Sequence, residues 1–165
     1  PTPPRHARAS TSAWPTKPPR RRRAEPLQTT RPDVHLLINI DVDDLARAEA
    51  FYRDAFGLAA ARRFGDAVLE MTGAPVPFYL LRKDAGSEGA AGSARHYRRH
   101  WTPLHLDMVV EDLDAALARA LAAGGRAEGE VREAAWGRIV QLADPFGHGW
   151  CLLQFLGRGY DGIAS

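Results

Sequence analysis

The chain is poor in cysteine, with Cys151 as the single copy among 165 residues. An internal disulfide is therefore excluded, and nothing in the sequence calls for an oxidising compartment. Long apolar runs are also missing, since no stretch reaches the roughly 18 residues of a membrane-spanning helix. We therefore expect a soluble, cytoplasmic protein with no membrane partner.

Acidic residues are scarce only at the N-terminal end. Residues 1–32 contain eight Lys or Arg against one Glu, together with eight of the twelve prolines, so the net charge of +2 combines +7 here with −5 in the rest. Such a stretch buries little, and we expect residues 1–33 to form a disordered basic leader. The run Arg20–Arg23 leaves a nucleic-acid arm or a twin-arginine export signal as alternatives. The residues after it are not apolar, which argues against export, and we do not expect a nucleic-acid partner.

The rest of the chain contains an internal repeat. Residues 38–48 and 106–116 each run from an alternating strand into Asp-Leu and a helix, and the two Asp-Leu pairs begin 68 residues apart at Asp44 and Asp112. A hydrophobic fraction of 45% over this length is enough for one domain with a core. The repeat predicts two copies of one small unit and a cleft shared between them.

Both units show the same order of elements. The first is predicted to have a strand at 35–42, a helix capped by Asp43 or Asp44 and ended by Gly57, and strands at 58–64, 67–71 and 76–82. The second is predicted to have a strand at 102–110, a helix at 112–123 packing through Leu113, Leu117, Ala120 and Leu121, and strands at 126–131, 138–142 and 149–155.

The predicted fold class is therefore α+β, with two tandem βαβββ modules. We expect module one at 34–83, a linker at 84–101, module two at 102–156 and a C-terminal tail at 157–165. The linker is interpreted as a solvated connection. Its basic and aromatic end leaves the alternative that it closes over an anionic ligand.

Three motifs together resemble a known family. They are the Asp-Leu helix starts, the segment 51–58 (FYRDAFGL) and Asp144-Pro145-Phe146-Gly147-His148 before the last strand. They are similar to the vicinal oxygen chelate superfamily, which includes glyoxalase I, extradiol dioxygenases, fosfomycin-resistance enzymes and bleomycin-binding proteins. The resemblance covers about residues 34–156 and implies sheets curled around a cleft and a homodimer. It leaves the activity open, because this fold serves several chemistries and also plain binding.

The resemblance also implies positions for a metal site. His105 lies seven residues before Asp112 and matches a family histidine, whereas Leu37 occupies the same place before Asp44. Cys151 stands where the family usually has Glu, and the equivalent place in module one, around residues 78–80, has no carboxylate. A metal site needs at least three good donors, and Asp107, on the same face of its strand as His105, is a further possible one. His35 is a poorer candidate because it lies one strand repeat, about 6.6 Å, from Leu37.

Two functions remain as hypotheses. The first is a binding protein that holds a small, partly aromatic or hydrophobic molecule in a cleft with no required cofactor. The residues predicted to line this cleft are Leu37, Tyr79, Trp101, His105, Trp136 and Cys151. The alternative is a metal-dependent enzyme of lyase, isomerase or dioxygenase type that uses a divalent metal ion on His105 and Cys151.

Residue chemistry narrows the enzyme alternative. Glyoxalase-type isomerisation and extradiol oxygen chemistry are disfavoured, because the expected metal-site carboxylate is missing. A His105–Cys151 nucleophilic pair lacks an evident third, orienting residue. Cys151 is equally consistent with a small buried hydrophobe, His148 with a structural residue of its turn, and Trp136 with a packing residue.

Overall fold

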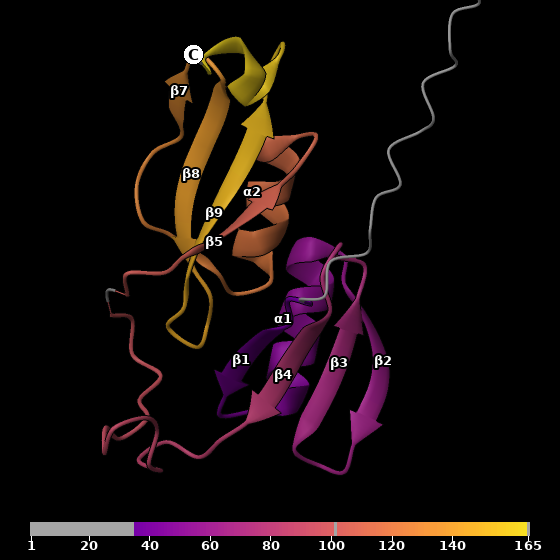
Figure 1. The fold of residues 1–165 in the computed structure, drawn as a ribbon, viewed down its shortest axis with the longest axis vertical. Coiled ribbons are helices and arrows are strands. Elements are labelled where there is room, and N and C mark those ends of the chain that lie inside the picture. Colours follow the sequence, from indigo (N-terminus) through magenta and orange to yellow (C-terminus); the bar gives the residue numbers. More distant parts are fainter. Residues whose placement is uncertain (1–34, 101, 165) are drawn as a thin grey trace, which may run out of the picture. The chain divides into compact units, whose positions relative to one another are not determined.

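The computed structural model describes residues 35–100 and 102–164 (Figure 1). The expected basic leader at 1–33 and the predicted cleft residue Trp101 lie outside these described residues. Residues from His35 onward form one compact unit.

The first module contains one helix and a four-stranded sheet. Its elements are β1 (Ile38–Val42), α1 (Leu45–Phe56), β2 (Ala59–Phe64), β3 (Val68–Thr72) and β4 (Phe78–Arg82). The strand order is β1-β4-β3-β2, with β1 parallel to β4 and the other pairs antiparallel. The parallel pair is possible because α1 carries the chain back between β1 and the strands that follow.

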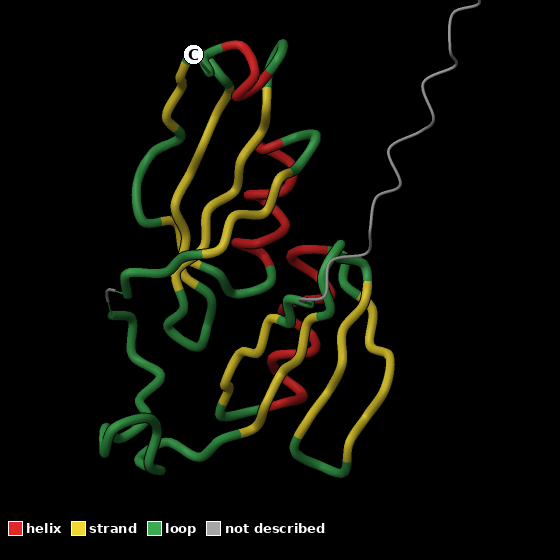
Figure 2. Tube along the Cα trace, in the orientation of Figure 1, coloured by secondary structure: helices red, strands yellow, loops and turns green. Residues whose placement is uncertain are grey.

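The second module repeats this plan (Figure 2). Its elements are β5 (Leu106–Val109), α2 (Leu113–Ala122), β6 (Arg126–Ala127), β7 (Arg132–Ala134), β8 (Gly137–Ala143) and β9 (Gly149–Phe155). The strand order is β5-β9-β8-β6, with β5 parallel to β9 and β7 also paired to β8. The prediction of an α+β fold with two βαβββ modules is confirmed.

Three predicted strands are wrong in their extent: those expected at 35–42 and 102–110 begin only at Ile38 and Leu106, and the one expected at 126–131 is interrupted. The segment 126–131 was expected to be continuous, but β8 pairs with Ala127 through Leu142 and then with Arg132 through Ile139. Between these two pairs the chain advances five residues, from Ala127 to Arg132, while β8 advances only three, from Ile139 to Leu142. Two extra residues therefore loop out and interrupt the pairing. The pattern of alternating residues could not show this, because it carries no information on cross-strand pairing.

Each helix begins at a side-chain cap. Asp44 Oδ1 accepts a hydrogen bond from the Arg47 N–H at 3.0 Å, and Asp112 Oδ1 accepts one from the Ala115 N–H at 3.0 Å. These bonds satisfy amide groups that have no partner inside the helix. The structure thus selects Asp44, and not Asp43, as the cap of α1.

The two helices and one face of each sheet enclose a common core. α1 packs on α2, and Trp150 of β9 lies 5.7 Å from the Tyr52 ring of α1 between ring centroids. The Tyr52 hydroxyl donates to Asp144 Oδ2 at 2.6 Å, which joins the two modules through a buried hydrogen bond. Leu121 does not share this core, since it is 44% exposed and α2 buries Leu113, Ala116 and Ala120.

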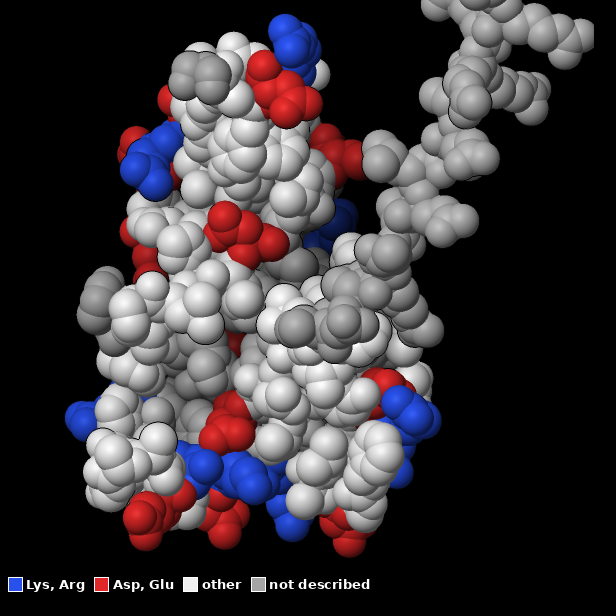
Figure 3. Space-filling model, viewed as in Figure 1, with Lys and Arg blue, Asp and Glu red and all other residues white. Residues whose placement is uncertain are grey.

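The linker is fastened to both modules and is more than a solvated connection. Residues 86–95 form a small hairpin, in which the Gly86 and Arg95 N–H groups donate to Arg95 O and Ser87 O. Arg95 then pairs with Asp41 of β1 at 2.7 Å, and Arg99 pairs with Glu128 of the second module at 2.8 Å. On the face drawn in Figure 3, charges of both signs are interspersed and no continuous basic stripe crosses it.

No helix within residues 35–100 and 102–164 is long and apolar enough to cross a membrane.

Candidate functional site

Each sheet has a face turned away from its helix, here called the helix-free face. Along β9, Trp150 and Leu152 belong to the core shared with the helices, so Cys151 and Leu153 point to the opposite side. Along β1, Ile40 and Val42 belong to the core in the same way, and Asn39 and Asp41 point away from it. Because side chains alternate between the two faces of a strand, each sheet has one face that carries polar side chains, alone or together with apolar ones.

Three side chains meet on the helix-free face of the second sheet. Asp107 of β5 and Cys151 of β9 are direct partners in the parallel ladder. His105 comes just before β5, and its Nε2 atom lies 3.5 Å from Asp107 Oδ1. One donor atom from each of the three residues lies within 4.8 Å of the others. The structure thus brings together His105, Asp107 and Cys151, which we call the HDC cluster.

The thiol of this cluster is held in its neutral form. Burial raises the pKa of Cys151 to about 11, and the negative charge of Asp107 and a hydrogen bond to it act in the same direction, while Arg132 opposes them. The Cys151 residue is 3% exposed, whereas the His105 side chain is 63% exposed. A neutral, buried thiol is a poor nucleophile, and a metal ion would have to displace its proton before binding.

The other predicted cleft residues lie in different surroundings. Leu37 precedes β1 and is half exposed. Tyr79 of β4 donates its hydroxyl hydrogen bond to Glu70 Oε1 at 3.0 Å. Trp136, between β7 and β8, forms an aromatic trio with Phe155 and Tyr160, with ring centroids 5.2 Å apart for Trp136 and Tyr160.

Glu70 and Arg62 form a polar network that the sequence reasoning missed. Arg62 donates from Nε and Nη2 to the two carboxylate oxygens of Glu70 at 2.5 and 2.6 Å. These hydrogen bonds, against a smaller opposing effect of burial, lower the pKa of Glu70 to about 2. The resemblance places the family's metal-site carboxylate of module one around residues 78–80, which contain none. Glu70 lies on the neighbouring strand, as the cross-strand partner of Tyr79. Its signal in the sequence is a lone Glu inside the apolar run Val68–Met71.

Apolar side chains flank these polar groups on the helix-free faces. Phe64 of β2, Val109 of β5 and Phe155 of β9 are 48%, 60% and 37% exposed. Arg62 lies over the Phe64 ring at 5.5 Å from its centroid. Exposed apolar residues that gather around a few polar groups are typical of a surface that binds a ligand or another protein.

The turn before β9 holds a buried carboxylate. Asp144 accepts hydrogen bonds from the Tyr52 hydroxyl, the His148 ring at 2.8 Å and the N–H groups of Phe146 and His148. Burial alone would raise the pKa of Asp144, but the hydrogen bonds from His148 and Tyr52 outweigh it, so the pKa is lowered. Burial of the Tyr52 side chain, together with the charge of Asp144, raises the pKa of Tyr52. This geometry explains the Asp-Pro-Phe-Gly-His motif as a packed structural turn.

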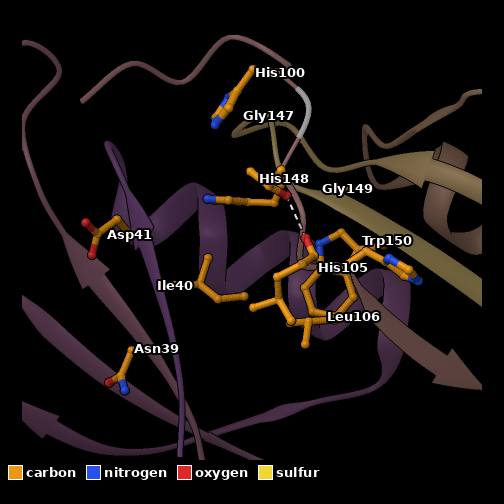
Figure 4. A pocket seen from close by; sticks show the side chains of 12 residues that line it. Asn39, Ile40, Asp41, His100, His105, Leu106, Gly147, His148, Gly149 and Trp150 are labelled. Atoms are coloured by element: carbon orange, nitrogen blue, oxygen red, sulfur yellow. Dashed lines mark hydrogen bonds between the residues drawn. The ribbon is translucent and has the colours of Figure 1, made fainter. Parts of the chain in front are cut away.

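A pocket of about 290 Å³ lies beside this turn, where the edge strands β1 and β5 approach the end of the linker (Figure 4). We call it the seam pocket. Its walls combine Ile40, Leu106 and Trp150 with the imidazoles of His100, His105 and His148.

Known proteins resemble this chain in sequence. The anthracycline biosynthesis protein DauV of Streptomyces sp. (strain C5) is 31% identical over 121 residues, which cover 71% of this chain and 40% of that protein. An uncharacterized protein of Mycobacterium tuberculosis is 33% identical over 121 residues, which cover 68% of this chain and 69% of that protein. The chain thus spans less than half the length of the anthracycline protein.

Solved structures share the fold at lower identity. The fosfomycin resistance protein FosX of Listeria monocytogenes has a TM-score of 0.58 and 18% identity, covering 76% of this chain and 96% of that one. TioX of Micromonospora sp. ML1 has a TM-score of 0.58 and 19% identity, covering 74% and 99%. The sequence profile described as "Glyoxalase-like domain" matches residues 37–153. With its paired βαβββ modules and this match, the chain belongs to the family of the glyoxalase-like domain.

Proposed function

We propose that this chain binds a small, partly aromatic or hydrophobic molecule on its helix-free faces, without the metal site that is usual in its family. The observation that carries the proposal is the neutral Cys151 thiol, buried beside Asp107 at the position where the family has a metal-binding Glu. The ligand contacts we propose are Leu37, Tyr79, Trp101, His105, Trp136 and Cys151.

The chemistry of the faces supports an aromatic ligand. Phe64 and Tyr79 on the first sheet and the aromatic trio on the second offer rings for stacking, and the HDC cluster and Glu70 offer hydrogen bonds. Two relatives are named anthracycline biosynthesis proteins, DauV and DnrV. Anthracyclines are planar polycyclic molecules with hydroxyl groups, so one of them is a suitable probe for this surface.

Titration calorimetry with an anthracycline tests the proposal. We expect binding by the wild type, about fivefold weaker binding by Trp136→Ala, because a lost stacking contact costs roughly 1 kcal/mol, and unchanged binding in EDTA. Leu121→Ala is the matched control, since Leu121 is exposed on α2 away from both faces. Equal affinities of Trp136→Ala and the wild type would contradict the proposal.

A metal-dependent enzyme is the second candidate, and the HDC cluster is the observation that favours it. Histidine, carboxylate and thiolate are all ligands of divalent zinc, and their number here meets the minimum for a site. A bound metal ion would supply Lewis-acid activation, and His105, Asp107 and Cys151 would hold it. Stoichiometric metal in protein purified without chelator, lost in His105→Ala and retained in His96→Ala, would decide for this candidate.

A homodimer and a cytoplasmic location belong to the same proposal. The exposed residues Phe64 and Val109 provide apolar area that a second copy would cover.

A further inference from the structure

The seam pocket has features that the proposed function does not use. It shares His105 with the HDC cluster, but its other walls come from β1, the end of the linker and the turn before β9. Two of its histidines, His100 and His148, belong to none of the contacts proposed above. The volume of about 290 Å³ lies near the lower limit of small-molecule sites, which favours a compact ligand of about one ring.

The protonation of the His148 ring follows from its partner. Its Nδ1 atom lies 2.8 Å from Asp144 Oδ2, and the Asp144 side chain is fully buried. The carboxylate already accepts from Tyr52 and from two backbone N–H groups, and an ionised carboxylate has no proton to donate. Nδ1 therefore carries the proton, and in the neutral ring Nε2 is left as a hydrogen-bond acceptor.

His100 is oriented by a similar contact. Its Nδ1 atom lies 3.0 Å from the carbonyl oxygen of Arg98, which can only accept. The neutral ring thus also presents Nε2 as an acceptor. Figure 4 labels both side chains at the pocket.

The remaining walls combine a larger apolar area with the polar residues Asn39, Asp41 and Thr102. Ile40 and Trp150 are 6% and 2% exposed, and Leu106 packs against the same core. An apolar cavity with one or two fixed acceptors selects a molecule that has an apolar body and a hydrogen-bond donor. An anion is less well suited, because the Asp41 carboxylate lies in the wall.

We propose that the seam pocket is a second binding site, which takes a compact, single-ring alcohol or phenol and accepts its hydroxyl hydrogen bond at His148 Nε2. The ring lies against Ile40, Leu106 and Trp150. His100 Nε2 provides a second acceptor for a ligand with two hydroxyl groups. The site shares His105 with the surface proposed for the larger aromatic molecule, and its other walls are different residues.

Fluorine NMR on the full chain tests this with two probes that differ by one donor. 4-Fluorophenol can donate to His148, and 4-fluoroanisole, in which the hydroxyl is methylated, cannot. We expect the phenol to bind about threefold to tenfold more tightly than the anisole, as one hydrogen bond predicts. Equal affinities of the two probes would overturn the proposal.

His148→Asn is the matched variant. The Asn amide can donate to Asp144 in place of Nδ1, so the turn keeps its hydrogen bond while the Nε2 acceptor is lost. We expect this variant to bind both probes equally, and Cys151→Ala, which alters the HDC cluster only, to keep the preference for the phenol. A preference retained in His148→Asn would contradict the assignment of His148.

A measurement on the wild type covers the case in which this variant fails to fold. A long-range proton–nitrogen spectrum should show Nδ1 protonated in His148 and a shift of Nε2 with 4-fluorophenol but not with 4-fluoroanisole. A protonated Nε2 in the neutral ring would refute the proposal. An excess of anthracycline should leave 4-fluorophenol bound. If the anthracycline does not bind at all, that result contradicts the proposed function alone. If it displaces the phenol, the two sites are one, and the proposal of a second site is refuted.

Discussion

Single residues in this chain have properties that their chemical type does not imply. Cys151 is a thiol with a pKa raised to about 11, Glu70 is a buried carboxylate with a pKa lowered to about 2, and Asp144 is a buried carboxylate with four donors. In each case the immediate neighbours set the result: Asp107 and burial for Cys151, Arg62 for Glu70, and His148 with Tyr52 for Asp144. The residue type alone would have left all three at their ordinary values.

The raised thiol pKa predicts slow alkylation of Cys151. At pH 8 its thiolate fraction should be about 100-fold below that of a thiol with an ordinary pKa near 9, so the rate with iodoacetamide should be at least that much lower. The rate should rise about tenfold per pH unit up to pH 11. Mass spectrometry of native protein over a pH series measures this.

The cause of the shift can be tested with Asp107→Asn. Removal of the charge should speed alkylation, but only in part, because burial is the largest cause and remains. The raised thiol pKa also sets how stability depends on pH. Its contribution to the free energy of unfolding is fully present below pH 9 and is lost as the pH rises through 11. Alkylation of native protein at the rate of a free thiol would contradict this description.

At the scale of elements, the helix starts are the most regular feature. Asp44 and Asp112 occupy equivalent places in the two modules and make the same bond to the residue three positions on, each at 3.0 Å. This equivalence of the two caps explains why the Asp-Leu repeat was visible in the sequence. The cap is local, and local rules act through residues that are close along the chain.

Asp44→Ala should lower the free energy of unfolding by about 1 kcal/mol, because an amide group of the first turn loses its partner. Asp43→Ala is the control, since Asp43 is equally acidic, exposed and adjacent but does not cap α1. It should change stability by less than about 0.5 kcal/mol. Urea unfolding of both variants measures the difference. Equal losses of unfolding free energy in the two variants would show that Asp44 is not the cap.

At the scale of the whole molecule, the modules are tied together by buried chemistry. Tyr52 from α1 bonds to Asp144 of the turn before β9, and both helices contribute to one core. The linker adds ion pairs to each module through Arg95 and Arg99. The helix-free faces still carry exposed apolar side chains, among them Phe64, Val109 and Phe155.

The proposed homodimer would form through those faces. Light scattering should give twice the chain mass of 18.1 kDa, and Val109→Lys should shift the equilibrium toward the monomer by placing a charge on an apolar face. Leu121→Lys is the control, because Leu121 is similarly exposed but lies on α2. A monomeric wild type, or an equal effect of both variants, would contradict the dimer.

Most of the fold could be predicted because its signals are periodic and local. The alternation of β1 and β9 and the helical spacing in α1 follow from which residues avoid water. Leu121 and the broken strand at 126–131 could not be predicted, since one depends on how α2 is rotated against α1 and the other on two residues that loop out opposite β8. The family resemblance predicted that His105 and Cys151 lie on neighbouring strands, and strand alternation added Asp107 to them. Glu70 was not predicted, because the resemblance pointed to residues 78–80 and Glu70 lies on the strand beside them.

The repeat, the helix starts and the α+β modules could be recognised in the amino-acid sequence, because hydrophobic periodicity and capping signals lie within a few positions of the chain. Only the tertiary structure decided the protonation of Cys151, the bond between Tyr52 and Asp144 and the orientation of His148 beside the seam pocket. These depend on groups that are up to 92 positions apart, and on burial that exists only when the modules are packed together. The electrostatics of a site are a property of that packing, and so its chemistry is settled there.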